Sequence, residues 1–469
     1  MTAHFEDCIK EAVAAFKQAK PFVVRIVANQ NADGIAAAGL LMNMLQREHI
    51  KFVVTIVRQM SAGLVEELKK EHYDTYFFVD LGSSHVQLLD SLKRRHIFVF
   101  DHHAAEQDAA GIFHLNPQLY DVDGLHDIAA AGVAYLFARA LNEENKDQAY
   151  LALVGAIGDG QERNGFSGYN QDFLDTAVAT QHVVQKHDLR IFGVQTKPLY
   201  KALEYSTSPY IPGVTGNEKE AQRFLEKHGV IPLDQGKGRH LRDLSEAEVK
   251  KLIVAITTQR KGSDENDEVY GPVYLLASEP YGSMLQDLRE FSTLLNCCAR
   301  MRKGGLGLGV CMGSMASRAR ALELHSKYVQ DIISSLHWFY QHKGKENYVE
   351  EYQGYVIFNA EEAIKDSLLG TLCSLISRSN IYPDGTILIG SAHGLDDYTK
   401  ISARIAGANI NDLHAGKILE HLTQKFSGQA GGHSFAAGAT IPKDQEQAFL
   451  LAAKEFLQQY LAIHTPVGS

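Results

Sequence analysis

Residues 23–45 read VVRIVANQNADGIAAAGLLMNML and join a strand-like run to a helix-like run. The apolar first part ends in a polar loop that holds Asn29, Asn31, Asp33 and Gly34. Small and apolar residues then continue at helical spacing. This order of strand, polar loop and helix is typical of a parallel sheet covered by helices, in which residues at the strand ends bind ligands.

The first 200 residues repeat this alternation. Further strand-like runs are FVVTIV (52–57), TYFFVD (75–80) and HIFVFDHH (96–103). The stretch YLALVGAIGDG (150–160) is more helix-like, because it follows the small-residue run of a preceding helix. The sequence therefore predicts an α/β fold with an N-terminal domain at residues 1–200, in which helices flank a parallel sheet.

The remaining chain divides into a helical part and a second alternating part. Residues 201–340 predict a mainly helical insertion and a connecting helix, which covers MASRARALELHSKYVQDIISSLHWFYQHKGK (315–345). Ser245 and Glu248 have the spacing of a capping box, and KGSDENDEVYGP (261–272) predicts a loop. Residues 341–469 alternate again and predict a smaller α/β domain.

Composition narrows the class of protein. The chain has 469 residues, of which 45% are hydrophobic, and it has no apolar stretch near the ~18 to 20 residues that a membrane helix needs. Its first residues lack a secretion-signal pattern, so we expect a cytoplasmic protein without membrane contact. The five cysteines form no C-x-x-C pair, which argues against a thiolate zinc site. The net charge of -10 argues against non-specific coating of nucleic acid, so any nucleic-acid contact requires a local basic groove.

Metal-competent side chains stand at the ends of predicted strands or helices in four separate segments. They are Asp33, Asp80, Asp101 with His102 and His103, and Asp159. Each signal is weak by itself, because a lone Asp after a strand is usually a helix cap or a turn residue. Oxygen and imidazole ligands together suit Mn²⁺ better than a thiolate-preferring metal. Such a metal would lower the pKa of a water to about 7 and draw charge from a phosphoryl oxygen.

The order of these motifs resembles that of a known family. The motifs are NADG (31–34), VDLG (79–82), DHH (101–103) and GDG (158–160), and in this order they resemble the DHH phosphoesterase superfamily. Further stretches resemble its archaeal RecJ-type branch: LLNCCARMRKGGLGLGVCMG (294–313), KISAR (400–404) and AGGHSFAAGATIP (430–442). The last of these also resembles the DHH-associated C-terminal domain, so the resemblance spans nearly the whole chain.

The resemblance implies a fold, a cofactor and a set of functional residues. Two Mn²⁺ or Mg²⁺ ions would lie at the sheet edge, and the C-terminal domain would close over a nucleic-acid strand. One metal site would consist of Asp33, Asp80, His102 and Asp159. Asp101 and His103 would complete the catalytic set. They would contact the metal ligands instead of the metal, or they would face the phosphate. The phosphate backbone or terminal nucleotide would be held by Arg300, Ser402, Arg404, Gly431, Gly432 and His433.

The chain departs from the family pattern at its first motif. The family has an Asp where this chain has Asn31, and a His or Asp where it has Asn29. Two divalent cations ~4 Å apart repel by roughly 16 kcal/mol at an effective dielectric of ~20, so neighbouring carboxylates must offset that repulsion. Amide oxygens are weaker ligands for Mn²⁺. We therefore expect one tight metal site and a second site with Asn29 and Asn31 as weak ligands.

Three functions are compatible with these features. The first is a RecJ-like exonuclease in DNA replication or repair that hydrolyses single-stranded DNA or RNA by metal-activated water. The second is a catalytically inactive replication scaffold that binds single strands, GINS and the MCM helicase, with GINS contacted by residues 205–290. The third, a phosphodiesterase for short oligonucleotides or cyclic dinucleotides, is disfavoured by the insertion. The complete Asp33, Asp80, His102 and Asp159 set favours the enzyme, because clustered carboxylates are costly to keep in a scaffold.

Overall fold

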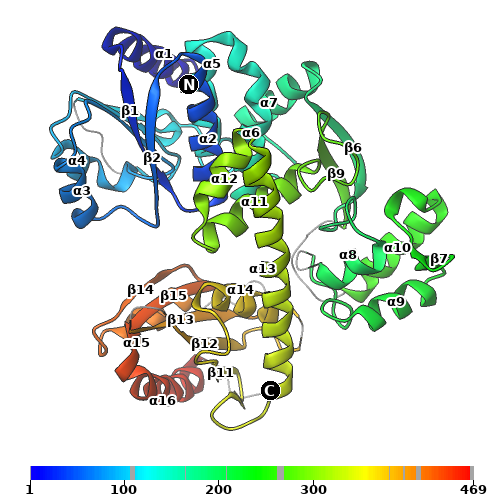
Figure 1. Ribbon diagram of the computed structural model, residues 1–469. Coiled ribbons are helices and arrows are strands. Elements are labelled where there is room, and N and C mark those ends of the chain that lie inside the picture. The colour runs from blue at the N-terminus through cyan, green and yellow to red at the C-terminus, as the bar shows by residue number, and fades with distance from the viewer. Residues whose placement is uncertain are drawn as a thin grey trace. The chain divides into compact units, whose positions relative to one another are not determined.

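The computed structural model describes residues 2–105, 111–163, 165–206, 209–260, 269–379, 381–394, 397–407 and 413–464. By packing, the chain divides into two compact units (Figure 1). The first combines residues 1–190 with residues 270–326, and the second combines residues 191–269 with residues 327–469. The domain boundaries near residues 200 and 340 stay a prediction. No helix of the described residues is long and apolar enough to cross a membrane.

A five-stranded parallel sheet forms the centre of the first unit, with the strand order β2-β1-β3-β4-β5. Its strands are β1 (Val23–Asn29), β2 (Lys51–Val57), β3 (Thr75–Val79), β4 (His96–Phe100) and β5 (Ile112–Leu115). The first four confirm the prediction, and so does the parallel arrangement. The four-residue strand β5 was not predicted, because it is too short to show an alternating pattern.

Helices pack on both faces of this sheet (Figure 1). They include α1 (Thr2–Ala19), α2 (Ala32–Arg47), α3 (Ala62–Lys69), α4 (Val86–Asp90) and α5 (Ala130–Leu141). Successive strand residues point to opposite faces, so neighbouring residues enter different cores. Phe77 joins the core beneath α1, α2 and α5, and Phe78 joins the core beneath α3 and α4. The predicted α/β class is therefore confirmed.

Small residues bring the helices of the first unit close together. The further helices are α6 (Ala149–Gly158), α7 (Gly168–Ala179), α11 (Leu288–Arg300) and α12 (Gly304–Cys311). A Cβ on Gly155 of α6 would lie 2.3 Å from the Oδ1 of Asp33 and 2.4 Å from the Cβ of Ala131 on α5. Only glycine fits there, so its absence of a side chain sets how closely α6 approaches α2 and α5.

A two-stranded antiparallel sheet carries the ends of the insertion. It pairs β6 (Val183–Leu189) with β9 (Tyr270–Leu276), and Leu189 lies opposite Tyr270. The chain therefore leaves and re-enters the first unit at the same end of this ribbon. The ribbon was not predicted, and residues 270–272 of the predicted loop belong to β9. Residues 261–268 of that loop lie outside the described residues.

The insertion is mainly helical, as expected. Its elements are α8 (Leu199–Tyr205), α9 (Glu218–Lys227), β7 (Leu233–Asp234), β8 (Lys237–Gly238) and α10 (Glu246–Gln259). The predicted capping box is present: the Glu248 N–H donates to Ser245 Oγ over 3.3 Å, and the Ser245 N–H donates to Glu248 Oε2 over 2.8 Å. A hydrogen bond from Arg239 and the bond from Ser245 lower the pKa of Glu248 to about 2.

Ser245→Ala is expected to lower the stability of the insertion by about 1 kcal/mol, the usual cost of losing an N-cap hydrogen bond. Hydrogen exchange of the first turn of α10 would measure the change directly. Thr257→Ala, at an exposed position inside the same helix, is the matched control and should not raise exchange. Equal exchange in Ser245→Ala and native protein would contradict a stabilising role of the cap.

The C-terminal part consists of a long helix and a mixed sheet with the order β10-β11-β12-β13-β15-β14. The predicted long helix is α13 (Met315–His342). The strands are β10 (Val349–Tyr352), β11 (Tyr355–Asn359), β12 (Ile387–His393), β13 (Tyr398–Ile405), β14 (Gln429–Gly432) and β15 (Ala436–Pro442). The helices that pack on this sheet are α14 (Asp366–Ser377), α15 (Ala415–Thr423) and α16 (Glu446–His464). This smaller α/β sheet domain confirms the predicted fold of the C-terminal part.

Candidate metal centre

The ends of the parallel strands and of two helices bring together the side chains that the sequence singled out. Asp80 directly follows β3, and His102 lies two residues after β4. Asp33 lies in the first turn of α2, and Asp159 is the C-cap residue of α6. Asp80 has a positive φ of 59°, a left-handed conformation that Asp tolerates better than most residues. The sheet topology therefore brings four segments that are distant in sequence to one place.

The four predicted ligands form one compact group. His102 Nε2 lies 2.9 Å from Asp159 Oδ2, 3.4 Å from Asp80 Oδ1 and 3.8 Å from Asp33 Oδ2. One ligand atom from each of the four residues lies within 4.8 Å of all the others. Asp33, Asp80 and His102 are buried, and the Asp159 side chain is 21% exposed. Asp159 is thus the member of the group that a substrate can reach.

Burial makes these acidic groups hard to ionise, and a bound cation would make it easier. Burial raises the pKa of Asp33, and the charges of Asp159 and Asp80 raise it further. Burial also raises the pKa of Asp80. Its Oδ1 accepts no hydrogen bond from any described residue, although buried carboxylate oxygens are normally paired. Three carboxylates, of which one has an oxygen without a hydrogen bond from a described residue, and one imidazole are a donor set that fits a divalent cation such as Mn²⁺.

The His102 ring is oriented toward this group by contacts on its other side. Its Nδ1 lies 2.6 Å from the carbonyl oxygen of Gly124, which can only accept, so Nδ1 carries the proton. Without a cation, burial lowers the pKa of His102, but the close carboxylates of Asp159 and Asp80 and the charge of Asp33 outweigh it and raise the pKa to about 12. Gly124 also accepts a hydrogen bond from Gln161. Orientation by such a bond is typical of metal-binding histidines.

Gly124 and Gln161 were not among the residues predicted from the sequence. A Cβ on Gly124 would lie 2.3 Å from the carbonyl oxygen of His102, so this position requires glycine. Gln161 directly follows the GDG motif, and this adjacency was the one available signal. Gly124 stands in a loop without any motif, so its role follows only from the three-dimensional contact.

Asp101 supports the two histidines instead of joining the four-residue group. Its Oδ1 accepts hydrogen bonds from the backbone N–H groups of His102 and His103 and lies 2.7 Å from His103 Nδ1. Its Oδ2 accepts from the Ser83 N–H over 2.9 Å. Although burial raises the pKa of Asp101, the His103 interaction and these bonds hold it well below its usual range. His103 is half exposed and can join Asp80 and His102 in a second possible ligand group.

Asp101→Asn is expected to lower the pKa of His103. The hydrogen bond to Asp101 is the largest cause that raises this pKa, and it outweighs the effect of burial. An amide removes the negative charge, so the imidazolium loses its partner and the pKa moves back toward ~6.5. The measurement is an NMR titration of the His103 ring in metal-free protein. An unchanged His103 pKa would show that Asp101 does not hold the proton.

The two asparagines of the first motif lie beside the four-residue group. Asn29 Nδ2 donates to Asp80 Oδ2 over 3.0 Å, and Asn29 Oδ1 accepts from the Gln30 N–H. Asn31 is the N-cap residue of α2, and its Oδ1 accepts from the Gly34 N–H over 2.7 Å. Both amide oxygens therefore bond to backbone groups. Weak metal ligation by Asn29 and Asn31 stays a prediction that requires these side chains to turn.

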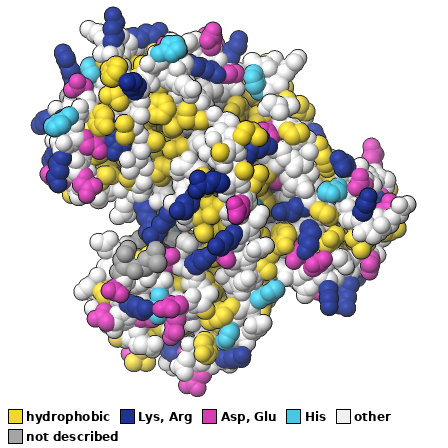
Figure 2. All heavy atoms as spheres, in the orientation of Figure 1, with side chains coloured by type: hydrophobic (Ala, Val, Ile, Leu, Met, Phe, Trp, Pro, Cys, Tyr) yellow, Lys and Arg dark blue, Asp and Glu magenta, His cyan; other side chains and the backbone are white. Residues whose placement is uncertain are grey.

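Arg300 stands at the C-terminus of α11, next to the loop that carries both asparagines. Gln30 Nε2 donates to the carbonyl oxygen of Ala299 over 2.6 Å, which ties this loop to α11. Arg300, Arg302 and Lys303 are exposed. Figure 2 shows Lys and Arg side chains gathered near the middle of the drawn face. The predicted phosphate-binding Arg300 thus stands in an exposed basic stretch of the same unit as the four-residue group.

The other predicted phosphate-binding residues belong to the second unit. Ser402 and Arg404 lie on β13, on the side of the sheet that contacts α14. The Arg404 guanidinium donates to Ser374 Oγ, Ser402 Oγ and the carbonyl oxygens of Gly370, Ala403 and Ala437. These contacts fix the Arg404 side chain in place. They also occupy donors that a phosphate would need.

The segment Gly431, Gly432 and His433 ends β14 and begins the turn to β15. A Cβ on Gly431 would meet no atom within 4 Å, whereas one on Gly432, which has a φ of 152°, would lie 2.5 Å from the Ala436 carbonyl oxygen. Gly432 is therefore required by the turn itself. Gly431 leaves its backbone open to approach by a ligand, which agrees with the predicted phosphate contact.

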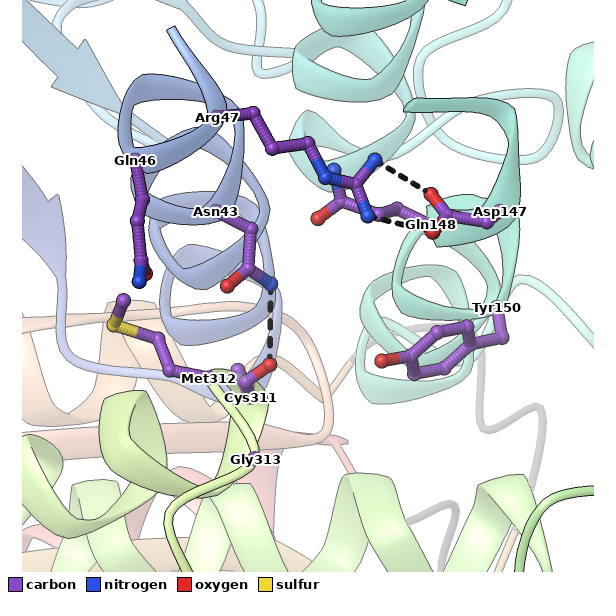
Figure 3. Close-up of a pocket in the computed structure, with 9 residues that line it drawn as sticks. All are labelled: Asn43, Gln46, Arg47, Asp147, Gln148, Tyr150, Cys311, Met312 and Gly313. Carbon is purple, nitrogen blue, oxygen red and sulfur yellow. Dashed lines mark hydrogen bonds and ion pairs between the residues drawn. The ribbon is translucent and has the colours of Figure 1, made fainter. Parts of the chain in front are cut away.

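A separate pocket lies near the opposite end of α2 (Figure 3). Its volume is about 490 Å³, and it is lined by residues of α2, of the segment 147–150 and of the C-terminal end of α12. Arg47 pairs with Asp147, the one acidic residue that lines it, over 2.6 Å (Figure 3). Because this pocket offers no free carboxylate or imidazole group, the four-residue group is the better candidate for chemistry.

Comparison with known proteins supports the family that the motifs indicated. Family models match the DHH family N-terminal domain at residues 23–157, the DHH-CID domain at residues 191–265 and the DHHA1 domain at residues 353–459. An uncharacterized protein of Methanocaldococcus jannaschii is 27% identical over 448 residues, which cover 93% of this chain and 94% of that protein. The matched domains thus follow the order that the motifs predicted.

Solved structures with the same fold cover the chain almost completely. Exonuclease RecJ bound to manganese has a TM-score of 0.57 at 16% identity, covering 96% of this chain and 94% of the other. CDC45 from Entamoeba histolytica has a TM-score of 0.67 at 14% identity, covering 97% and 98%. At these identities the likeness shows the fold alone. The three matched domains establish that the chain belongs to the DHH superfamily, and its fold is the one that RecJ and CDC45 share.

Proposed function

We propose that the chain is a metal-dependent exonuclease that acts in the cytoplasm on single-stranded DNA or RNA. The observation that carries this proposal is the four-residue group with the unpaired oxygen of Asp80. Buried carboxylates in such a group repel one another, so they are costly unless a cation is bound. The manganese named with the RecJ structure makes Mn²⁺ the first metal to test, with Mg²⁺ as the second.

The residues have distinct tasks in this proposal. Asp33, Asp80, His102 and Asp159 would hold the metal, which when bound would supply an activated water and draw charge from the phosphoryl oxygen. Asp101 positions His103, whose ring is half exposed and can donate a proton to the substrate. Arg300 binds a backbone phosphate by its planar set of donors. Gly431, Gly432 and His433 hold the strand or its terminal nucleotide, and Ser402 and Arg404 join them once the Arg404 guanidinium exchanges its hydrogen bonds to the protein for a phosphate.

The test is degradation of end-labelled single-stranded DNA and RNA by native protein, with Mn²⁺, with Mg²⁺ and with a chelator. We expect hydrolysis that requires the metal, and the ladder of products gives the polarity of digestion. Asp159→Ala in the same preparation should remove the activity. Equal activity in native and Asp159→Ala protein would assign the hydrolysis to another site or to a contaminant.

A second candidate function is a catalytically inactive replication scaffold. The observation that favours it is the pair Asn29 and Asn31, which replaces charged ligands of the family. The likeness to CDC45 is compatible with it, although that likeness shows only the fold. In this case the chain would bind single strands, GINS and the MCM helicase without cutting. Metal-independent strand binding together with no hydrolysis under any metal would favour the scaffold.

Binding of GINS would involve the insertion, residues 205–290, in either function. The test is a pull-down that compares native protein with a variant lacking this segment. We expect GINS to be lost with the segment, and undiminished GINS binding would contradict the assignment.

A further inference from the structure

The loop between β1 and α2 presents N–H groups where the family has metal ligands. A backbone N–H can only donate, so the side-chain atom it contacts must be the amide oxygen. The Gln30 N–H thereby identifies Asn29 Oδ1, at 2.8 Å, and the Gly34 N–H identifies Asn31 Oδ1, at 2.7 Å. The NH₂ group of each side chain therefore remains available for another contact. This assignment does not depend on a choice between the two amide orientations.

The NH₂ group of Asn29 lies against one oxygen of Asp80. Asn29 Nδ2 donates to Asp80 Oδ2 over 3.0 Å, while Asp80 Oδ1 lies 3.4 Å from His102 Nε2. The two oxygens of Asp80 therefore face different surroundings. Oδ1 lies beside the imidazole of the four-residue group, and Oδ2 is occupied by the N–H donor of Asn29, so it is not open to a second cation.

The loop is held so that this amide cannot easily turn. Gln30 Nε2 donates to the Ala299 carbonyl oxygen over 2.6 Å, and the Ala32 N–H donates to Asn296 Oδ1 over 3.1 Å. A Cβ on Gly34 would lie 2.5 Å from the Asn29 carbonyl oxygen, so the start of α2 packs directly on the loop. These contacts fix the backbone around Asn29, and its side chain is held at both amide atoms by the Gln30 N–H and by Asp80 Oδ2.

We propose that this chain binds one divalent cation, and that the Asn29 N–H replaces the second cation of the family at Asp80 Oδ2. The charges agree with this assignment. Three carboxylates around one divalent cation leave a net charge of about -1, which an N–H donor partly offsets, whereas two cations would leave about +1 beside two NH₂ groups that repel cations. The proposal rests on the metal-dependent function above and sets the number of ions at that same site.

Asn29→Asp tests the role of the amide most directly. It would place a carboxylate about 3 Å from Asp80 Oδ2, and two carboxylates this close favour a bound cation or a shared proton. We therefore expect this variant to bind a second ion. Asn43→Asp is the matched control, because it makes the same substitution on α2 near the pocket of Figure 3, away from the metal group.

The experiment is titration of metal-free protein with Mn²⁺ in the absence of substrate, with bound ions counted by calorimetry and by electron paramagnetic resonance. We expect one ion in native protein and in Asn43→Asp, with the hyperfine pattern of an isolated Mn²⁺. We expect two ions in Asn29→Asp, with the broadened spectrum of a coupled pair. The double variant Asn29→Asp with Asn31→Asp is also titrated, because a second ion could require both added carboxylates in order to bind.

Each outcome separates this inference from the proposed function. Two ions in native protein would overturn the inference and leave the exonuclease proposal standing. One ion in Asn29→Asp and in the double variant would also overturn it, because the amides would not then be what excludes the second ion. One ion in a native chain that hydrolyses nothing would overturn only the exonuclease. No bound ion in native protein would overturn both.

Discussion

His102→Ala is expected to lower the rate of single-strand hydrolysis by about 10³-fold or more. His102 is the one imidazole in the four-residue group, and its Nε2 lies within 3.8 Å of all three carboxylates. A catalytic metal contributes several kcal/mol to stabilising the transition state. Losing about 4 kcal/mol of that contribution corresponds to about 10³-fold in rate. The measurement is the single-turnover rate of hydrolysis of an end-labelled strand with Mn²⁺.

The matched control for this variant is His126→Ala. The His126 side chain is 71% exposed and pairs with Asp123, so it has the same chemistry outside the metal group. Its hydrolysis rate should equal that of native protein. Circular dichroism should show that both variants keep the native fold. A folded His102→Ala protein with a native rate would contradict the assignment of catalysis to this group.

Mn²⁺ is expected to raise the stability of the native protein strongly. It should raise the stability of the Asp159→Ala variant hardly at all. A ligand that binds only the folded state stabilises it by about 4 kcal/mol at a free concentration of ~1,000 times its Kd. The effect should be large here, because the cation also relieves the burial of charge and the repulsion among the carboxylates, which together raise the pKa of Asp33 in metal-free protein. Asp159 is the most exposed ligand, so its removal least endangers the fold. The measurement is the midpoint of thermal unfolding with and without Mn²⁺.

Asp123→Ala provides the control, since the Asp123 side chain is 49% exposed and lies outside the metal group. Its unfolding midpoint should shift with Mn²⁺ by as much as that of native protein. If Mn²⁺ shifted the midpoint of Asp159→Ala equally, the stabilising ion would bind elsewhere on the chain.

Much of the fold was predictable because its strands are short apolar runs that end in polar residues. β1, β3 and β4 are buried on both faces, so their sequences are almost entirely apolar and their ends are sharp. The β6–β9 ribbon was missed for the opposite reason. β6 has mixed polar and exposed residues, and its partner is separated from it by the whole insertion.

The four candidate metal ligands could be selected from the sequence because each stands in a motif at the end of an element. That these ligands meet could be predicted only with the sheet order, which places the ends of β1, β3 and β4 side by side. Their role as ligands stays a proposal. What the sequence could not show is the direction of neutral groups: the Asn29 amide faces Asp80, and the Gly124 carbonyl orients His102. Hydrogen bonds between distant loops leave no periodic signal in a single sequence.

Anomalous diffraction from crystals soaked in Mn²⁺ tests most directly whether Asp33, Asp80, His102 and Asp159 form a metal centre. We expect a single strong anomalous peak enclosed by these four side chains, with no second peak beside Asp80 Oδ2. Absence of a peak within this group, while Mn²⁺ binds elsewhere on the chain, would show that these residues are not a metal centre.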